Sequence, residues 1–169
     1  MLTRISFFAS TACVLIAFAA PAIADPSCVP VYDAGVKQMQ TPHHVFTTRS
    51  HNGKASSTSE TIFIDGIVYS QLNGQWQRSR MSGADMLQMA KEKRKEEDPD
   101  EKCRIVGDDT IAGDAAQVYT LGNEKGAGSK LWISKATGAL LRQAIALPDG
   151  SISDSRYEYK NVQAPAAVH

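Results

Sequence analysis

The histidines are the first side chains to test for catalysis or metal binding, because His43, His44 and His51 lie in one short segment. Composition alone leaves a Ser-His-Asp arrangement open, but the chain has no G-x-S-x-G segment to present a nucleophilic serine. Adjacent strand residues point to opposite faces, so His43 and His44 cannot readily share one metal ion. We interpret these histidines as surface residues at the start of a strand.

Other motifs for catalysis, metals or cofactors are missing from the sequence. H-E-x-x-H, the P-loop and G-x-G-x-x-G do not occur. The acidic stretches 98–101 and 108–109 do not form the D-x-[DN]-x-[DN]-G pattern of a calcium-binding loop. We therefore expect a protein that is not an enzyme and that has no metal or cofactor.

The charge balance argues against a nucleic-acid partner, because 18 Lys and Arg residues offset 18 Asp and Glu residues. The basic segment 91–95 is followed by acidic residues 96–98 and contains no aromatic residue. Opposite charges recur there at i,i+4 spacing, which is typical of the solvated end of a helix. A docking surface for an acidic partner is the alternative interpretation.

The N-terminal segment has the features of a secretory signal peptide. Arg4 precedes the apolar run Phe7–Ala20, and the small residues Ala22 and Ala24 end the segment before Asp25. The run is shorter than the roughly 20 residues of a membrane-spanning helix. We predict cleavage after residue 24 and a periplasmic mature protein, with an uncleaved anchor as the alternative.

The predicted organisation is a signal peptide at residues 1–24, a single domain at 25–165 and a flexible tail at 166–169. No second apolar run follows the first, so we expect no stable membrane insertion. Once Cys13 leaves with the signal peptide, Cys28 and Cys103 remain as a pair in an oxidising compartment. This predicts a disulfide between them, with two free thiols as the alternative.

Hydrophobic periodicity and turn residues predict a helix, a series of strands, a second helix and a second series of strands. The turns Asn52-Gly53, Asp65-Gly66 and Asn73-Gly74 mark antiparallel hairpins, with residues 54–59 interpreted as a polar connection. Ser82 and Asp85 resemble a capping box, and Pro99 should end the second helix. The expected helices are 31–40 and the segment from 82; the expected strands are 44–50, 60–65, 67–72, 75–81, 103–107, 116–121, 130–134, 139–147 and 151–162.

Runs of strands interrupted by helices indicate an α+β protein with an antiparallel sheet. A sheet of this size normally curls, and helices inside the curl would bury its apolar face. We therefore predict a curved antiparallel sheet with one or two helices against its concave face.

Three segments carry a family resemblance. They are 111–119 (IAGDAAQVY), 131–142 (LWISKATGALLR) and 157–162 (YEYKNV). Together they resemble the periplasmic lipoprotein-carrier superfamily, the LolA/LolB-like proteins, over residues 103–165. The resemblance implies a half-open β-barrel that binds acyl chains of lipoproteins, or peptides and lipids, without catalysis.

Large apolar side chains are numerous enough to line a ligand cavity beneath a helix, although the same residues would also fill an ordinary core. Methionine suits a pocket for varied apolar shapes because it is flexible and polarisable. We expect a monomeric carrier that sequesters a lipid or a lipoprotein acyl chain. The alternative is an envelope protein-interaction or sensor module without a small ligand. The candidate lining residues are Phe46, Phe63, Tyr69, Trp76, Met86, Met89, Tyr119 and Trp132.

Overall fold

The computed structural model describes residues 26–168 except 73, 96–100 and 123–127. The signal peptide predicted at 1–24 and the helix end expected at Pro99 lie outside these residues. In chain order the elements are η1 (Pro26–Cys28), α1 (Val29–Gln38), β1 (His43–His51), β2 (Lys54–Ile64), β3 (Ile67–Leu72), β4 (Gln75–Arg78), α2 (Gly83–Lys95), β5 (Lys102–Ile111), β6 (Asp114–Gly122), β7 (Gly128–Ser134), β8 (Leu140–Ala146) and β9 (Ile152–Glu158).

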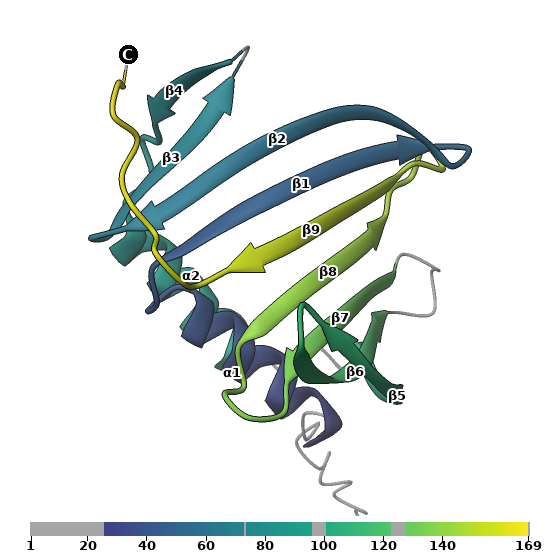
Figure 1. Cartoon of the computed structure of the whole chain (residues 1–169). Helices are drawn as coiled ribbons and strands as arrows, with labels where there is room; N and C mark the ends of the chain where they lie inside the picture. The colour runs from purple at the N-terminus through teal and green to yellow at the C-terminus, as the bar shows by residue number, and fades with distance from the viewer. Residues whose placement is uncertain (1–25, 73, 96–100, 123–127, 169) are drawn as a thin grey trace, which may run out of the picture.

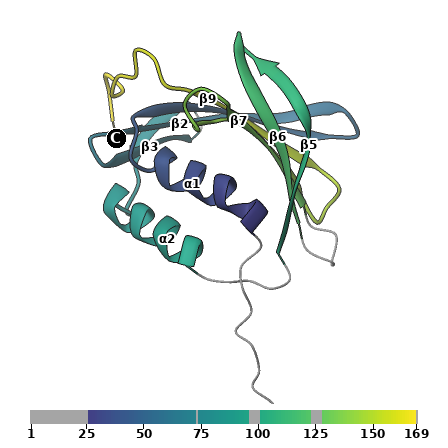
Figure 2. The ribbon, with the colours of Figure 1, turned by 90° about the horizontal axis from the view of Figure 1, so that it is seen from below.

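The strands form one sheet of nine in the order β4-β3-β2-β1-β9-β8-β7-β6-β5, and all neighbouring pairs are antiparallel. The sheet bends around α1, and α2 lies against α1 on the side away from the sheet (Figures 1 and 2). We call the face toward α1 the inner face and the opposite one the outer face. The α+β class and the half-open barrel predicted from the sequence are confirmed.

Local sequence explains where α2 begins. The Ser82 hydroxyl accepts a hydrogen bond from the Asp85 backbone N–H at 3.1 Å, and the Asp85 carboxylate accepts one from the Ser82 N–H at 3.2 Å. This is the predicted capping box, with Asp in the third position. A β-carbon on Gly83 would lie 2.8 Å from the Gly66 backbone. Glycine therefore lets α2 start directly against the β2–β3 turn.

Four strand predictions were wrong by three or more residues at one end. The strands expected at 75–81 and 151–162 already end at Arg78 and Glu158, and the other two are longer than expected. The polar connection expected at 54–59 is the first half of β2, whose backbone pairs with β1. Pairing with the long strand β1 makes this segment a strand, although its residues do not alternate between apolar and polar. Likewise, 103–107 is only part of β5, which continues through Asp108 and Asp109 with a bulge between Ile105 and Gly107. Beyond the bulge, the side chains that would have pointed inward point outward, so Asp109 lies on the outer face.

The β5–β6 hairpin turns at Ala112 and Gly113, which have φ angles of 51° and 91°. Both values lie in the left-handed region used by tight hairpin turns. The tip of this hairpin projects beyond the outer face, on the side opposite the helices (Figure 2). It therefore forms a wall above the outer face of the sheet.

The main core lies between α1 and the inner face. Its α1 members are Val31 and Ala34, and Leu131 is one of its sheet members at 5% exposure. The predicted disulfide between Cys28 and Cys103 is present in this cluster, with its Cα atoms 5.0 Å apart. It ties the start of α1 to the edge strand β5. None of the described helices is long and apolar enough to cross a membrane.

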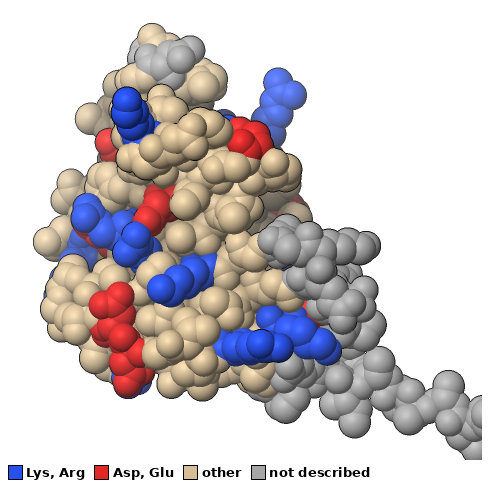
Figure 3. Space-filling view, turned by 90° about the vertical axis from the view of Figure 1, so that its right-hand side faces the viewer, with Lys and Arg blue, Asp and Glu red and all other residues tan. Residues whose placement is uncertain are grey.

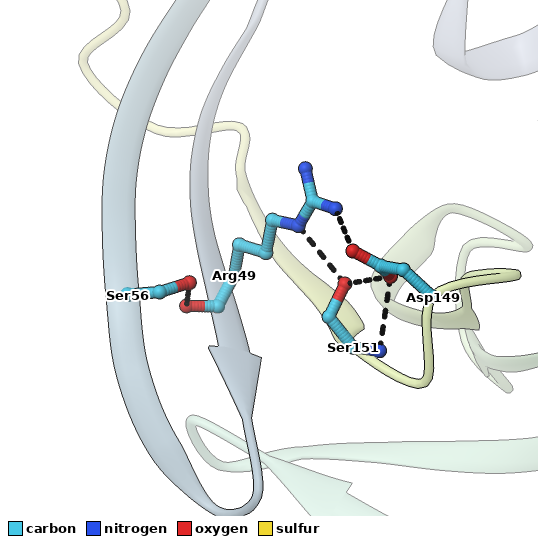
Figure 4. Close-up of polar contacts among 4 residues, drawn as sticks. All are labelled: Arg49, Ser56, Asp149 and Ser151. Carbon is cyan, nitrogen blue, oxygen red and sulfur yellow. Dashed lines mark hydrogen bonds and ion pairs between the residues drawn. The ribbon is translucent and has the colours of Figure 1, made fainter.

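The inner face becomes polar beyond α1. The Arg49 guanidinium donates hydrogen bonds to the Ser151 hydroxyl at 2.9 Å and to the Asp149 carboxylate at 2.6 Å (Figure 4). The Ser151 hydroxyl and backbone N–H also bond Asp149, which lowers the pKa of that carboxyl to about 2. A hydroxyl pair, Thr47 and Ser155, lies on the same face with its oxygens 2.9 Å apart. The apolar part of the inner face is thus confined to the end that α1 covers.

Candidate functional site

The eight predicted lining residues do not share one surface, and strand alternation accounts for the division. Four lie on the outer face and two on the inner face, while two belong to α2. His43 and Val45 face inward on β1, which places the intervening His44 and the following Phe46 outward. The outer-face residues are Phe46, Tyr69, Trp76 and Trp132; the inner-face residues are Phe63 and Tyr119; the α2 residues are Met86 and Met89.

The inner-face pair is packed rather than available to a ligand. Tyr119 belongs to the buried cluster beneath α1 and is 4% exposed. Phe63 is also buried and stacks on the ring of His43, with centroids 5.3 Å apart. Together with α1, these side chains occupy the inner face at its apolar end.

His43 differs from the surface histidine that we predicted, because its side chain is buried among aromatic rings. Desolvation lowers the pKa of His43, while a contact of 2.8 Å between its Nδ1 atom and the Thr41 carbonyl opposes this shift. His44 lies on the opposite face, 3.0 Å from the Glu60 carboxylate. The two histidines therefore cannot share a ligand. Within the described residues, no cluster of three or more His, Cys, Asp or Glu could hold a metal ion.

An apolar groove of about 350 Å³ lies between α1 and α2, and we call it the methionine groove. Met86 and Met89 lie together in it, although the predicted cavity was between the sheet and the second helix, and Met39 and Met81 lie beside them. Nothing in the sequence indicated that the latter pair would join them, because Met81 was assigned to a strand and Met39 to the apolar positions of the first helix. The full lining is Val31, Tyr32, Gly35, Gln38, Met39, Met81, Met86, Met89, Ala90 and Lys93.

The groove remains open because α2 is not packed into the core. Gly83 is the only buried residue of this helix among those described, and Met89 is 56% exposed. Polar contacts instead hold the helices together at the rim of the groove. Arg94 of α2 pairs with Asp33 of α1 at 2.6 Å, and Lys93 lies 3.3 Å from Glu101.

The outer face carries aromatic rings in contact with cations. The Arg142 guanidinium lies 4.5 Å from the Trp132 ring centroid, and the Trp132 indole N–H donates to the Asp109 carboxylate at 2.8 Å. That hydrogen bond is the main cause of a lowered pKa at Asp109. Hydrogen bonds to Asp154 raise the pKa of Arg142. These rings are therefore held by polar partners on a partly solvated face.

Basic side chains occur in separate groups on the flank that faces the viewer in Figure 3, with acidic side chains among them. This view shows the right-hand side of Figure 1, which includes the edge strand β5. The mixture agrees with the net charge of zero. On this flank the charges do not form the continuous basic surface of a nucleic-acid-binding protein.

No protein-family model matches the sequence, and no curated protein matches it. Among solved structures, MucB is similar at 20% identity and a TM-score of 0.50, over 83% of this chain and 63% of that one. LppX from Mycobacterium tuberculosis matches at 9% identity and a TM-score of 0.48, over 83% of this chain and 100% of that one. A LolA-superfamily protein from Nitrosomonas europaea matches at 9% identity and a TM-score of 0.30, over 76% of this chain and 90% of that one.

The similarity to MucB shows the fold. This chain shares with MucB an α+β half-open barrel, the fold that the resemblance in its sequence implies. It spans 58%, 60% and 63% of the MucB chains that it matches.

Proposed function

We propose that this protein is a secreted, periplasmic, non-enzymatic binding protein that holds a single aliphatic chain in the methionine groove. The observation that carries the proposal is the open apolar groove between α1 and α2. The signal peptide predicted at 1–24 and the Cys28–Cys103 disulfide support secretion. The bound aliphatic chain would thus lie between α1 and α2, and not inside the barrel, whose apolar end is filled by α1.

The chemistry of the groove suits an alkyl chain. Methionine side chains adapt to different apolar shapes, and α2 can shift because few of its side chains are buried. A volume of about 350 Å³ falls at the small end of ordinary ligand pockets, which favours one chain over several. Burial contributes about 0.8 kcal/mol per methylene, so a chain of moderate length would bind usefully.

The charged rim indicates which end of the chain stays outside. Lys93 lines the groove and its ammonium group lies 3.3 Å from Glu101. An acyl chain with a carboxylate or ester head would lie with its tail among the methionines and its head near Lys93. A fatty acid is therefore the simplest probe.

Displacement of a fluorescent fatty acid tests the proposal. Met89→Glu places a charge in the groove at a position that is already 56% exposed, so the fold should tolerate it. Leu72→Glu is the matched control, because Leu72 is 57% exposed and lies outside the groove. We expect saturable binding by the native protein, a loss of about tenfold or more in Met89→Glu, and native affinity in Leu72→Glu.

Native mass spectrometry after purification without detergent gives a second reading of the same site. An alkyl ligand retained by the native protein and lost in Met89→Glu would support the proposal. If the native protein binds no fatty acid, or if both variants bind equally well, the methionine groove is not the site.

A protein-interaction module is the second candidate function, and the edge strand β5 favours it. Ile105 and Val106 are 58% and 52% exposed there, beside a strand edge without a neighbour in the described sheet. An extended segment of an envelope protein could add to this edge as a further strand. Val106→Lys and Ile152→Lys are matched variants, because each puts a charge in place of an exposed apolar side chain, on β5 and on β9 respectively. A partner that Ile152→Lys retains and Val106→Lys loses would indicate binding at the β5 edge. Equal retention by both variants would exclude it.

A further inference from the structure

A pocket of about 630 Å³ lies on the outer face, on the opposite side of the sheet from the methionine groove. Its lining residues on β1, β8 and β9 form the floor, and residues 110–112 of the β5–β6 hairpin form the wall. Figure 2 shows the tip of this hairpin projecting on the side of the sheet away from the helices. The volume lies well within the range of ligand-binding pockets. The lining residues are Phe46, Thr48, Ser50, Thr110, Ile111, Ala112, Arg142, Asp154 and Arg156.

Two guanidinium groups are placed beside each other in this pocket. Arg142 of β8 and Arg156 of β9 are direct cross-strand partners in the register of the sheet, and both face outward. Like charges at directly opposite positions destabilise a sheet. Asp154 is the only acidic residue in the lining and pairs with Arg142, whereas the carboxylate partner of Arg156, Glu158, lies outside the lining.

Both guanidinium groups are oriented before any ligand arrives. Arg142 lies over the Trp132 ring and donates through Nε to Asp154 at 2.9 Å. Arg156 lies over the Phe46 ring, with 5.6 Å between its Cζ atom and the ring centroid, and its Nη2 atom is 3.3 Å from Glu158. A pre-oriented guanidinium loses less conformational entropy when it binds an anion.

Hydroxyl groups supply further donors around the arginines. Thr48 and Ser50 reach the floor from β1, and Thr110 reaches the wall from β5. A tetrahedral phosphate has enough oxygens to accept from guanidinium and hydroxyl groups at once, whereas a carboxylate has only two. Phe46 and Ile111 add apolar surface beside these donors.

We propose that the outer-face pocket binds a phosphate-bearing ligand, which Arg142 and Arg156 hold through the phosphate. The hydroxyls of Thr48, Ser50 and Thr110 complete the phosphate contacts. The part of the ligand next to the phosphate lies against Phe46 and Ile111. The ligand is either a soluble phosphate ester or the headgroup of a phospholipid, and it is separate from the alkyl chain of the methionine groove.

Calorimetric titration with sn-glycerol 3-phosphate and sedimentation with phosphatidylglycerol vesicles test the two sources. Arg156→Gln removes one phosphate contact, and Arg104→Gln removes the same charge from β5, outside the pocket lining. We expect saturable binding that falls at least about tenfold in Arg156→Gln and stays within about twofold in Arg104→Gln. Thermal melting of each variant checks that the fold is retained.

A second variant fills the pocket without changing its charge. Ser50→Phe should weaken phosphate binding, while Met89→Glu should leave it unchanged, which separates this site from the methionine groove. Binding of glycerol phosphate identifies a soluble ester, and binding of vesicles alone identifies a lipid headgroup. The proposal is overturned if neither probe binds, if succinate binds in place of phosphate, or if Arg104→Gln weakens binding as much as Arg156→Gln.

Discussion

The two faces of the sheet use apolar residues differently. The inner face is apolar where α1 covers it, and there Val31, Leu131 and their neighbours form a closed cluster stabilised by the disulfide. The outer face holds Phe46 and Trp132 in contact with arginines, under a hairpin that leaves a pocket. The inner face therefore contributes mainly to stability, whereas the outer face has side chains still available to a ligand.

This contrast shows that an aromatic residue in a curved sheet is not by itself evidence for a ligand cavity inside the curve. Trp132 is buried, yet it is buried on the outer face by the returning β5–β6 hairpin. The open apolar surface lies instead between the helices, where α2 contributes methionines without entering the core.

Removal of the disulfide should have the largest effect on stability. Replacing Cys28 and Cys103 by Ala removes a cross-link between two residues that are 75 positions apart, and so frees the loop between them in the unfolded chain. The chain-entropy argument predicts a loss of about 4 kcal/mol in the free energy of unfolding. Urea denaturation of the double variant, and of the native protein in reducing agent, should give matching losses. A loss below about 1 kcal/mol would show that the disulfide does not hold the inner face together.

A pair of truncations compares the two faces directly. Leu131→Ala leaves a cavity beneath α1 and should cost about 3 kcal/mol. Phe46→Ala removes a half-buried ring and its contact with Arg156, and should cost about 1 kcal/mol. Equal losses in urea denaturation would contradict the division between a closed inner face and an open outer face.

The buried His43 should make stability depend on pH. Its pKa is lowered in the folded protein, so the unfolded chain takes up the proton first as the pH falls. Stability should be full above the unfolded value of 6.5 and should decline below it, until the folded pKa is passed. The urea concentration at the midpoint of unfolding, measured between pH 8 and 5, tests this dependence. In His43→Phe this midpoint should change less with pH than in the native protein. An equal change in that variant would assign the dependence to another group.

The exposed polar end of the inner face should give the smallest effect. The Asp149 carboxylate has a pKa of about 2, below its ordinary 3.8, so its contribution to stability is present above 3.8 and is lost as the pH falls toward 2. Ser151 supplies the strongest hydrogen bonds to Asp149, and Arg49 contributes less. Carbon-detected NMR titration should therefore show a larger upward pKa shift in Ser151→Ala than in Arg49→Gln. The reverse order would assign the shift to the ion pair.

Local sequence was sufficient where a signal depends on neighbouring residues. Ser82 and Asp85 predicted the capping box, and strand β3 was predicted over the same residues, 67–72, that it occupies. It was insufficient where pairing between strands decides the outcome. The polar first half of β2 is a strand because β1 lies beside it.

The sequence by itself determined the order and type of the elements, the antiparallel class and the cysteine pair, because periodicity, turn residues and thiol chemistry act over short stretches or by residue type. The tertiary structure alone decided which aromatic residues face which side, where Met39 and Met81 join the α2 methionines, and that Arg142 meets Arg156. Those placements depend on strand register, on the bulge in β5 and on how far α2 approaches α1. These features arise from contacts between distant residues, which hydrophobic periodicity does not encode.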